Sequence, residues 1–197
     1  KENLECSDTC CGEGFEQQFS KIEALSLEAG SITSDQNSSY EKINFSESKS
    51  EDYDDAAINI TITGLGFITI NKTKNFNFLL IQSAYACSPP DPIVKQKISS
   101  IKITSDTILT KENTSYNTGQ SISHLFEVVD ISNNTNRSIE DFITDQHKQP
   151  SLFGSYESSL ILKLNQQIHI PKNELSIDIT LDDGSQFFLK TNDFTIK

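Results

Sequence analysis

Four cysteines are the residues of this 197-residue chain whose type and spacing most clearly suggest chemistry. Cys6, Cys10 and Cys11 lie near the N-terminus, and Cys87 lies in the middle of the sequence. A disulfide between the neighbours Cys10 and Cys11 is disfavoured, because adjacent Cα atoms are about 3.8 Å apart, below the usual disulfide range. We therefore predict two disulfides, in which one of the adjacent pair bonds Cys6 and the other bonds Cys87. The spacing leaves open which of the two does which.

Zinc is the competing interpretation of the same thiols, since four thiolates complete a structural site. Such sites usually separate neighbouring ligands by about two to four residues, whereas Cys10 and Cys11 are adjacent. No CxxC motif is present for redox catalysis. We expect disulfides, and hence an oxidising and exported environment, with neither a metal nor a cofactor.

An acidic cluster surrounds Tyr53 and offers carboxylates to a hard cation. Asp52, Asp54 and Asp55 are the weak calcium candidates, because Ca²⁺ takes about six to eight oxygen ligands. The cluster lacks the glycine-turned spacing of a calcium loop. A solvated loop that protects a β edge from aggregation is the preferred interpretation.

The sequence contains no recognisable catalytic set. His124, His147 and His169 are the only histidines, and none lies in an HExxH motif. GxSxG is absent, and Ser123 is only a sequence neighbour of His124. We therefore predict no catalytic residues, and a hydrolase without a known motif is the third hypothesis, because a histidine would have to meet carboxylates in a cleft.

Charge and glycine spacing argue against nucleic-acid and nucleotide ligands. The chain has 16 basic and 28 acidic residues, a net charge of -12, whereas phosphate backbones are bound by clustered Lys and Arg. The stretch Gly64–Gly66 lacks the third glycine of a dinucleotide fingerprint and the lysine of a phosphate loop. The sequence predicts neither ligand.

The chain begins at Lys1 and contains no methionine, so we expect that a signal peptide has been removed. The longest apolar stretch, Phe78–Ile81, is far shorter than the roughly 20 residues of a membrane-spanning helix. The expectation is a soluble, exported chain.

Alternating apolar residues predict an all-β protein, an antiparallel, immunoglobulin-like β-sandwich. Residues 30 to 56 are mostly polar and predict a loop around one edge strand near Ile43 and Phe45, and Gly64 and Gly66 predict a turn or bulge. The other expected strands are Phe19–Leu27 (with an irregularity), Ile58–Ile62, Phe67–Ile70, Phe76–Ala86, Ile98–Ile103, Phe126–Val128, Leu160–Leu164, Leu175–Leu181, Gln186–Lys190 and Phe194–Ile196.

Two local signals complete the pattern. Ser138 is an N-cap candidate for one short helix near residues 138–146, because its hydroxyl can accept from the Asp141 amide while that carboxylate reaches back. Asp183-Gly184 predicts a two-residue type I′ hairpin loop.

We expect a disulfide-stapled arm at residues 1–14 and a single domain at 15–197, because a bridge to Cys87 would clamp the arm against a central strand. Two small β domains, 15–88 and 93–197, are the alternative.

The chain resembles the uncharacterised exported lipoproteins, about 200 residues long, of Bacteroidetes-type bacteria. The resemblance lies in CSDTCCG (6–12), SAYACSPPDP (83–92), ISSIKITS (98–105) and LDDGSQFFLKT (181–191), and it covers most of the chain. It implies a β-sandwich and a lipid-anchored precursor whose acylated cysteine precedes Lys1. Asp106-Thr107-Ile108 is similar to the short O-glycosylation motif of such bacteria.

The leading hypothesis is a non-catalytic interaction or structural module at the bacterial outer membrane, cell surface or periplasmic face, as an accessory subunit of an outer-membrane complex. Its expected partner is another envelope protein, with membrane contact only through the N-terminal lipid. The alternative is a calcium-dependent or glycan-binding adhesin module that uses the acidic cluster and the loop tyrosines Tyr40, Tyr53, Tyr116 and Tyr156.

Overall fold

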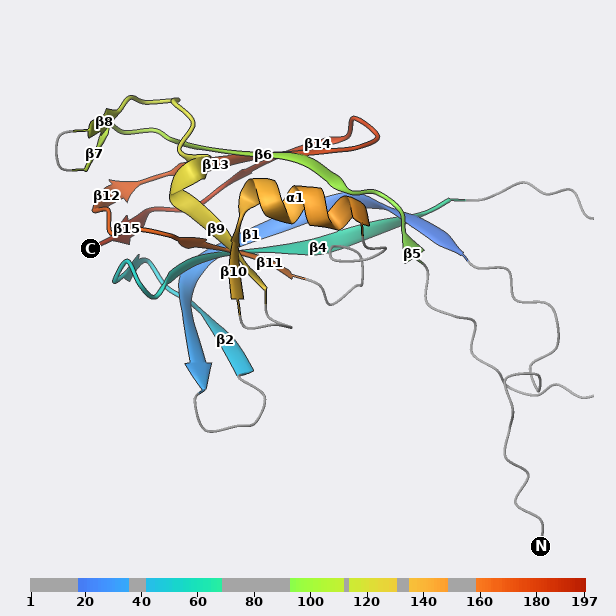
Figure 1. Cartoon of the computed structure of the whole chain (residues 1–197), viewed down its shortest axis with the longest axis horizontal. Helices are drawn as coiled ribbons and strands as arrows, with labels where there is room; N and C mark the ends of the chain where they lie inside the picture. Colours follow the sequence, from blue (N-terminus) through green and yellow to red (C-terminus); the bar gives the residue numbers. More distant parts are fainter. Residues whose placement is uncertain (1–17, 36–41, 69–92, 112–113, 131–134, 149–158) are drawn as a thin grey trace, which may run out of the picture.

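The computed structural model describes residues 18–35, 42–68, 93–111, 114–130, 135–148 and 159–197 (Figure 1). These residues form an all-β sandwich with one short helix, as the sequence predicts. The four cysteines, the arm at 1–14 and the expected strand Phe76–Ala86 lie outside the described ranges, so the disulfides stay a prediction.

A seven-stranded sheet forms one layer of the described fold. The order of six of its strands is β10-β9-β11-β4-β1-β2. The seventh, β5, pairs with β1 and lies outside this order. β1 pairs antiparallel with β4 over most of its length, which makes these two strands the centre of the layer. The bounds are β1 Phe19–Asp35, β2 Lys42–Glu47, β4 Ala56–Ile68, β5 Ile93–Val94, β9 Phe126–Asp130, β10 Thr135–Ser138 and β11 Ser159–Leu164.

The opposite layer is the three-stranded sheet β14-β13-β6, which lies above the main sheet in Figure 1. Two smaller sheets, β12-β15-β3 and β7-β8, lie toward one end. The pairs β1–β5 and β15–β3 are parallel, and the other pairs of named strands are antiparallel. The bounds are β3 Ser50–Glu51, β6 Ile98–Ser105, β7 Leu109–Lys111, β8 Thr114–Tyr116, η1 Ser123–Leu125, α1 Ile139–Lys148, β12 Ile170–Asn173, β13 Leu175–Leu181, β14 Gln186–Lys190 and β15 Phe194–Ile196.

The core lies between the two layers and is rich in isoleucine. Every second residue of β13 is buried from Leu175 to Leu181, and β4 buries Ile58, Ile60 and Ile62. Burial of each such side chain contributes about 1.5–3 kcal/mol. Strands β1 and β4 share one continuous core with β6, β9, β11, β13 and β15, so both halves of the sequence contribute to it.

The centre of the main sheet differs from the sequence prediction in the length of β1 and agrees with it on the position of an irregularity. β1 continues to Asp35 where a polar loop was expected, because it pairs with β2 from Gly30 to Asp35 and with β4 as far as Ser31. β4 runs as one strand through Gly64 to Ile68, without a turn, and its register with β1 shifts on both sides of the Ala24–Gly64 pair, where the sequence predicted an irregularity in Phe19–Leu27 and a turn or bulge at Gly64. A Cβ atom on Gly64 would lie 3.0 Å from the Ala24 Cβ, so glycine permits this close approach.

The predicted hairpin between β13 and β14 is present, but its loop has the three residues 182–184, closed by Leu181 and Ser185, so the predicted two-residue type I′ turn is wrong. The Leu181 amide donates to the Ser185 carbonyl, and the Gly184 amide donates to the Leu181 carbonyl. Gly184 has a φ of 85°, which places the left-handed residue last in the loop. This is the arrangement of a three-residue hairpin with a glycine bulge.

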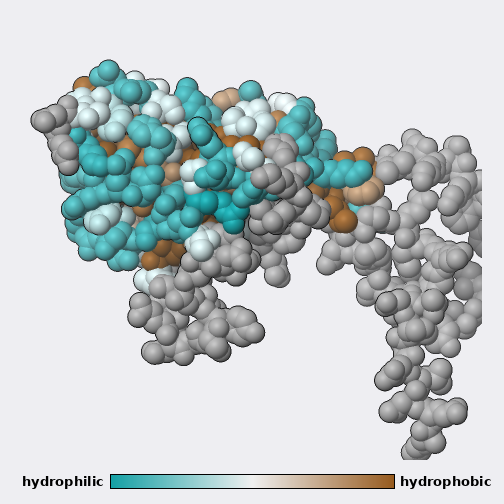
Figure 2. Space-filling model, viewed as in Figure 1, coloured by the Kyte–Doolittle hydropathy of each residue, from teal (hydrophilic) through white to brown (hydrophobic). Residues whose placement is uncertain are grey.

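Helix α1 begins directly after Ser138, as predicted, and continues to Lys148, slightly beyond the predicted end. No helix in the described ranges is long and apolar enough to cross a membrane. The coloured surface in Figure 2 is mostly hydrophilic, with an apolar patch at the right-hand end and smaller ones elsewhere. The exposed large apolar side chains of the described part are Phe67, Ile68, Ile93, Ile108 and Phe188.

Gln96 connects the hairpin loop to β1. Its Oε1 accepts from the Ile22 amide at 2.5 Å, and its Nε2 donates to Asp183 Oδ2 at 2.5 Å. The Ser185 amide donates to the other Asp183 oxygen at 2.9 Å. Hydrogen bonds from Ser185, followed by that from Gln96, lower the pKa of Asp183 below its ordinary value of 3.8.

Gly30→Ala should destabilise the fold by about 2 kcal/mol or more, because the added Cβ would lie 2.0 Å from the Ser46 carbonyl oxygen, where β1 pairs with β2. Urea denaturation followed by circular dichroism measures the change. Thr33→Ser, an exposed position in the same strand, is the control and should shift stability by less than about 0.5 kcal/mol. Equal midpoints for the two variants would contradict the close approach.

Asp183→Asn should reduce stability at neutral pH, and its deficit should shrink on acidification. Because folding lowers the pKa of Asp183, the carboxylate contributes stability above pH 3.8 that is lost as the pH falls through the lower folded value. Urea denaturation from pH 7 down to pH 2 tests this sign. Asp54→Asn is the control, since its exposed carboxylate accepts no hydrogen bond within the described residues. A deficit that is constant with pH would argue against the role of Asp183.

Candidate functional site

The acidic cluster forms a turn between β3 and β4. The Asp52 carbonyl accepts from the amides of Asp55 and Ala56, at 3.1 and 2.8 Å. The carboxylates of Asp52, Asp54 and Asp55 are exposed, while Tyr53 packs against the core. No group of three or more His, Cys, Asp or Glu side chains in the described ranges is arranged to hold a metal ion. The backbone hydrogen bonds of Asp52 and the packing of Tyr53 against the core stabilise this turn.

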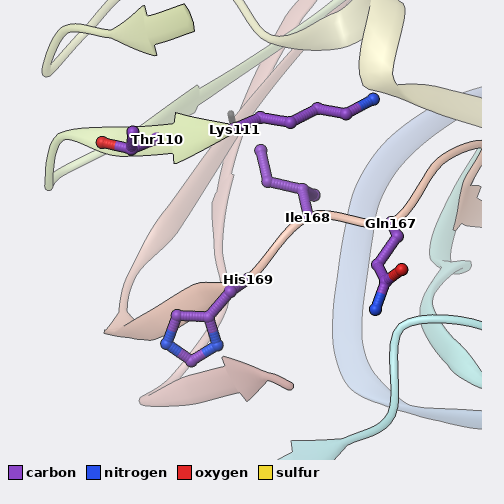
Figure 3. A pocket seen from close by; sticks show the side chains of 5 residues that line it. All are labelled: Thr110, Lys111, Gln167, Ile168 and His169. Atoms are coloured by element: carbon purple, nitrogen blue, oxygen red, sulfur yellow. The ribbon is translucent and has the colours of Figure 1, made fainter. Parts of the chain in front are cut away.

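The structure places two of the histidines in different hollows. His124 lies in η1, exposed, with its ring 5.6 Å from that of Tyr116 and tilted by 48°. His169 is exposed and lines a separate hollow near β7 (Figure 3). His147 belongs to α1, but its side chain lies outside what the structure describes.

The hollow beside His169 has a volume of about 410 Å³ and is lined by short segments around Lys111 and Ile168. Figure 3 shows the Lys111 side chain extending away from the imidazole. The Lys111 ammonium donates to Gln166 Oε1, so its charge is held by a neighbouring amide. This hollow therefore brings no acid and base together.

A larger groove lies between β6, η1 and the first turns of α1. Its volume is about 510 Å³. Ile101, Phe126 and Ile139 form a buried apolar floor. Hydroxyl, amide, imidazole and carboxylate groups form the rim. The full lining is Ser99, Ser100, Ile101, Ser121, Ser123, His124, Phe126, Ser138, Ile139, Glu140, Ile143 and Asn165.

The groove lies where no named strand pairs with the second edge of β6 in the described part: η1 and α1 contact this edge, and Thr104 forms an isolated bridge with Ser121. Ser123 Oγ accepts from the Ile103 amide at 2.8 Å and donates to the Ile101 carbonyl at 3.2 Å. At the other end, Gln146 Oε1 accepts from the Ile98 amide at 2.6 Å. Side chains thus cover the β6 edge at two points, and the segment between them borders the groove.

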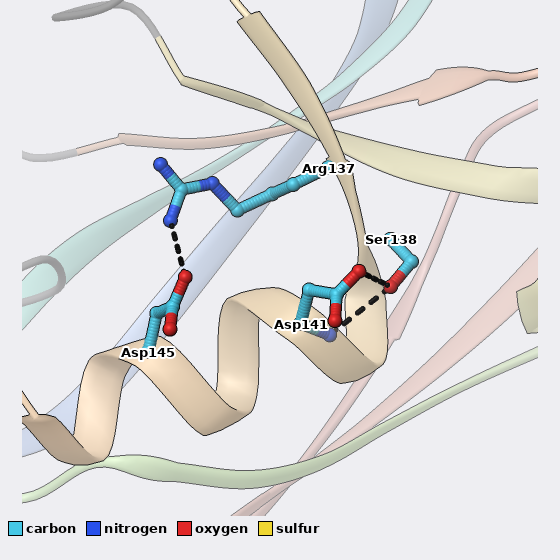
Figure 4. Close-up of polar contacts among 4 residues, drawn as sticks. All are labelled: Arg137, Ser138, Asp141 and Asp145. Carbon is cyan, nitrogen blue, oxygen red and sulfur yellow. Dashed lines mark hydrogen bonds and ion pairs between the residues drawn. The ribbon is translucent and has the colours of Figure 1, made fainter.

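The N-terminal wall of the groove is fixed by an N-cap at Ser138, shown in Figure 4. Ser138 Oγ accepts from the Asp141 amide at 3.0 Å and donates to Asp141 Oδ2 at 2.7 Å. Arg137 holds the second half of the helix through Asp145 at 3.2 Å. The cap was predicted from the sequence, and the structure confirms it.

Three of the rim residues make structural hydrogen bonds. Ser123 holds β6, Ser138 caps α1, and Asn165 Nδ2 donates to the His124 carbonyl at 2.9 Å. The His124 imidazole forms no hydrogen bond to a serine or carboxylate within the described residues. A serine nucleophile is activated by such a pair, which these described residues do not form.

Ser138→Ala should destabilise the protein by about 1 kcal/mol, because it leaves the Asp141 amide without its cap. Ser138→Thr should restore most of the loss, since threonine also caps. Urea denaturation of the three proteins measures the difference. Equal stability of the alanine and threonine variants would contradict the capping role.

Comparison with known proteins yields no match among protein-family models, curated proteins or solved structures. The functional interpretation therefore rests on the sequence and on the geometry of the described residues.

Proposed function

We propose that this chain is a non-catalytic interaction module of the bacterial cell envelope, an accessory subunit of an outer-membrane protein complex. The observation that supports it best is the groove between β6 and α1, with its apolar floor and polar rim. Protein interfaces combine these features, because apolar contact supplies affinity while the surrounding polar groups remain solvated.

The expected partner is an extended segment of another envelope protein. The bordering part of β6, Ser99 to Ile101, can offer backbone groups to such a segment, as sheet edges do in β-augmentation. An apolar side chain of the segment would occupy the floor over Ile101 and Phe126. The exported location rests on the cysteine content and the sequence resemblance.

A glycan is the second candidate ligand. Tyr116 and His124 form a tilted ring pair beside the groove, and the rim offers hydroxyl, amide and carboxylate groups that suit sugar hydroxyls. A glycan array probed with the intact chain, with and without calcium, tests this alternative. Silence under both conditions removes it.

Ser100→Arg should block the groove, because Ser100 is exposed on the rim and its hydroxyl makes no hydrogen bond within the described residues. Co-purification from detergent-solubilised envelopes of the producing cells should recover a specific partner with the unaltered chain. The arginine variant should recover at least tenfold less of this partner, which corresponds to a loss of about 1.4 kcal/mol of binding free energy.

Gln186→Arg is the matched control. Gln186 is exposed and pairs with Thr180 from the far side of β13, while Ser100 pairs with Thr180 from the near side. Both variants add the same charge to the same sheet. Recovery of the unaltered chain as a free monomer, or equal losses with both variants, would contradict the proposal.

A further inference from the structure

The loop between β13 and β14 contains the one Asp-Gly pair of the sequence, Asp183-Gly184. Such a pair can isomerise spontaneously. The glycine nitrogen attacks the aspartate Cγ, a new N–C bond forms, and the nitrogen's proton leaves with the acid hydroxyl as water. Glycine favours this ring closure, because it has no Cβ atom to shield its nitrogen. Water then breaks the bond from the nitrogen to the main-chain carbonyl carbon, and the product is isoaspartate, in which the chain runs through Cγ. One water is lost and one is gained, so no co-reactant is needed.

The folded loop holds both reacting groups. The Gly184 amide, which is the nucleophile, donates to the Leu181 carbonyl at 3.0 Å. One carboxylate oxygen of Asp183 accepts from the Ser185 amide at 2.9 Å, and the other accepts from Gln96 Nε2 at 2.5 Å. The reaction requires the nitrogen and Cγ to meet, and these three hydrogen bonds keep each of them in place.

The support for the loop comes from outside the hairpin. Gln96 is 7% exposed, and its Oε1 accepts from the Ile22 amide of β1. We call Gln96 with its hydrogen bonds to Ile22 and Asp183 the Gln96 clamp. Next to it, the Lys97 carbonyl accepts from the Asp182 amide at 2.8 Å, and the Lys97 amide donates to Asp182 Oδ1 at 3.1 Å. The loop is therefore fastened to β1 and to the residues just before β6.

The charge state of Asp183 also opposes the reaction. A carboxylic acid expels its hydroxyl as water more readily than a carboxylate expels an oxygen. Hydrogen bonds from Ser185, followed by that from Gln96, lower the pKa of Asp183. The reactive acid form is consequently scarcer in the folded protein than in the unfolded chain at the same pH.

We propose that Asp183-Gly184 is a latent isoaspartate site, which the Gln96 clamp keeps unreacted in the folded chain. Isomerisation adds one methylene to the main chain and leaves the carboxylate directly on Cα, so the carboxylate loses its present position against Gln96 and Ser185. The loop is then released from β1. This inference is independent of the proposed function, because none of the residues that line the groove belongs to the loop.

Ageing of the purified full chain at 37 °C and neutral pH tests the site. Enzymatic methylation of isoaspartate measures the extent of reaction, and mapping of the tryptic peptide 173–190 locates it. The unaltered chain should react slowly when folded and faster in urea. Gln96→Glu should raise the rate in the folded chain at least about fivefold, the order expected when one hydrogen bond no longer opposes the reaction. The ionised glutamate still accepts from Ile22, but it cannot donate to Asp183. Gln96→Ala should accelerate the reaction as well.

Ser138→Ala is the matched control, because it removes one hydrogen bond at the start of α1 and leaves the loop intact. It should age at the rate of the unaltered chain, and circular dichroism should show that all variants keep their fold. Three results would overturn the proposal: equal rates for the folded and the urea-unfolded chain, no acceleration by either Gln96 variant, or equal acceleration by Ser138→Ala, which would trace the reaction to global unfolding.

Hydrogen exchange of the aged chain tests the release of the loop. The Ile22 amide should exchange faster in the isomerised chain than in fresh protein, because Gln96 is no longer held in place by Asp183. Unchanged exchange at Ile22 would contradict the release. The Ser100 experiment uses fresh protein, so none of these outcomes bears on the groove.

Discussion

The fold depends on burying the apolar faces of two sheets against each other. Each face arises because apolar residues occupy every second position along its strands. β4 buries alternate isoleucines from one side, and β13 buries alternate residues from Leu175 to Leu181 from the other. Once the layers face one another, their edges must also be closed. On one side β14 contacts β1, and on the other α1 and η1 contact β6 and β9. A helix and a short turn cover a strand edge less completely than another strand, and the groove is the result.

Much of the strand pattern could be predicted because β-branched residues alternate clearly in β4, β6 and β13. The Ser138 cap was predictable for a similar reason, since its hydrogen bonds are local. The errors arise where pairing overrides local composition. The second half of β1 is polar, yet it is a strand because β2 and β4 supply its hydrogen bonds. The hairpin loop has three residues and not two. Within it, the Asp183 carboxylate accepts a hydrogen bond from the Ser185 amide.

The groove could not be predicted in the same way. Its lining comes from segments near residues 99, 121, 138 and 165, and serine and asparagine are too common in this chain to mark a site. Two other groups of residues, the acidic cluster and the cysteines, suggested chemistry from the sequence alone. The acidic turn is explained by its backbone hydrogen bonds and the buried side of Tyr53. The cysteines lie outside the described ranges, and their pairing stays a prediction.

The central claim is that the groove beside α1 is the surface through which this protein meets another. Hydrogen exchange of the intact chain, alone and with solubilised envelope proteins of the producing cells, tests it directly. The account predicts slower exchange in the peptides that cover residues 99–101, 121–126 and 138–143, because a bound segment would shield these amides. Unchanged exchange in all three segments, with protection elsewhere in the chain, would contradict it.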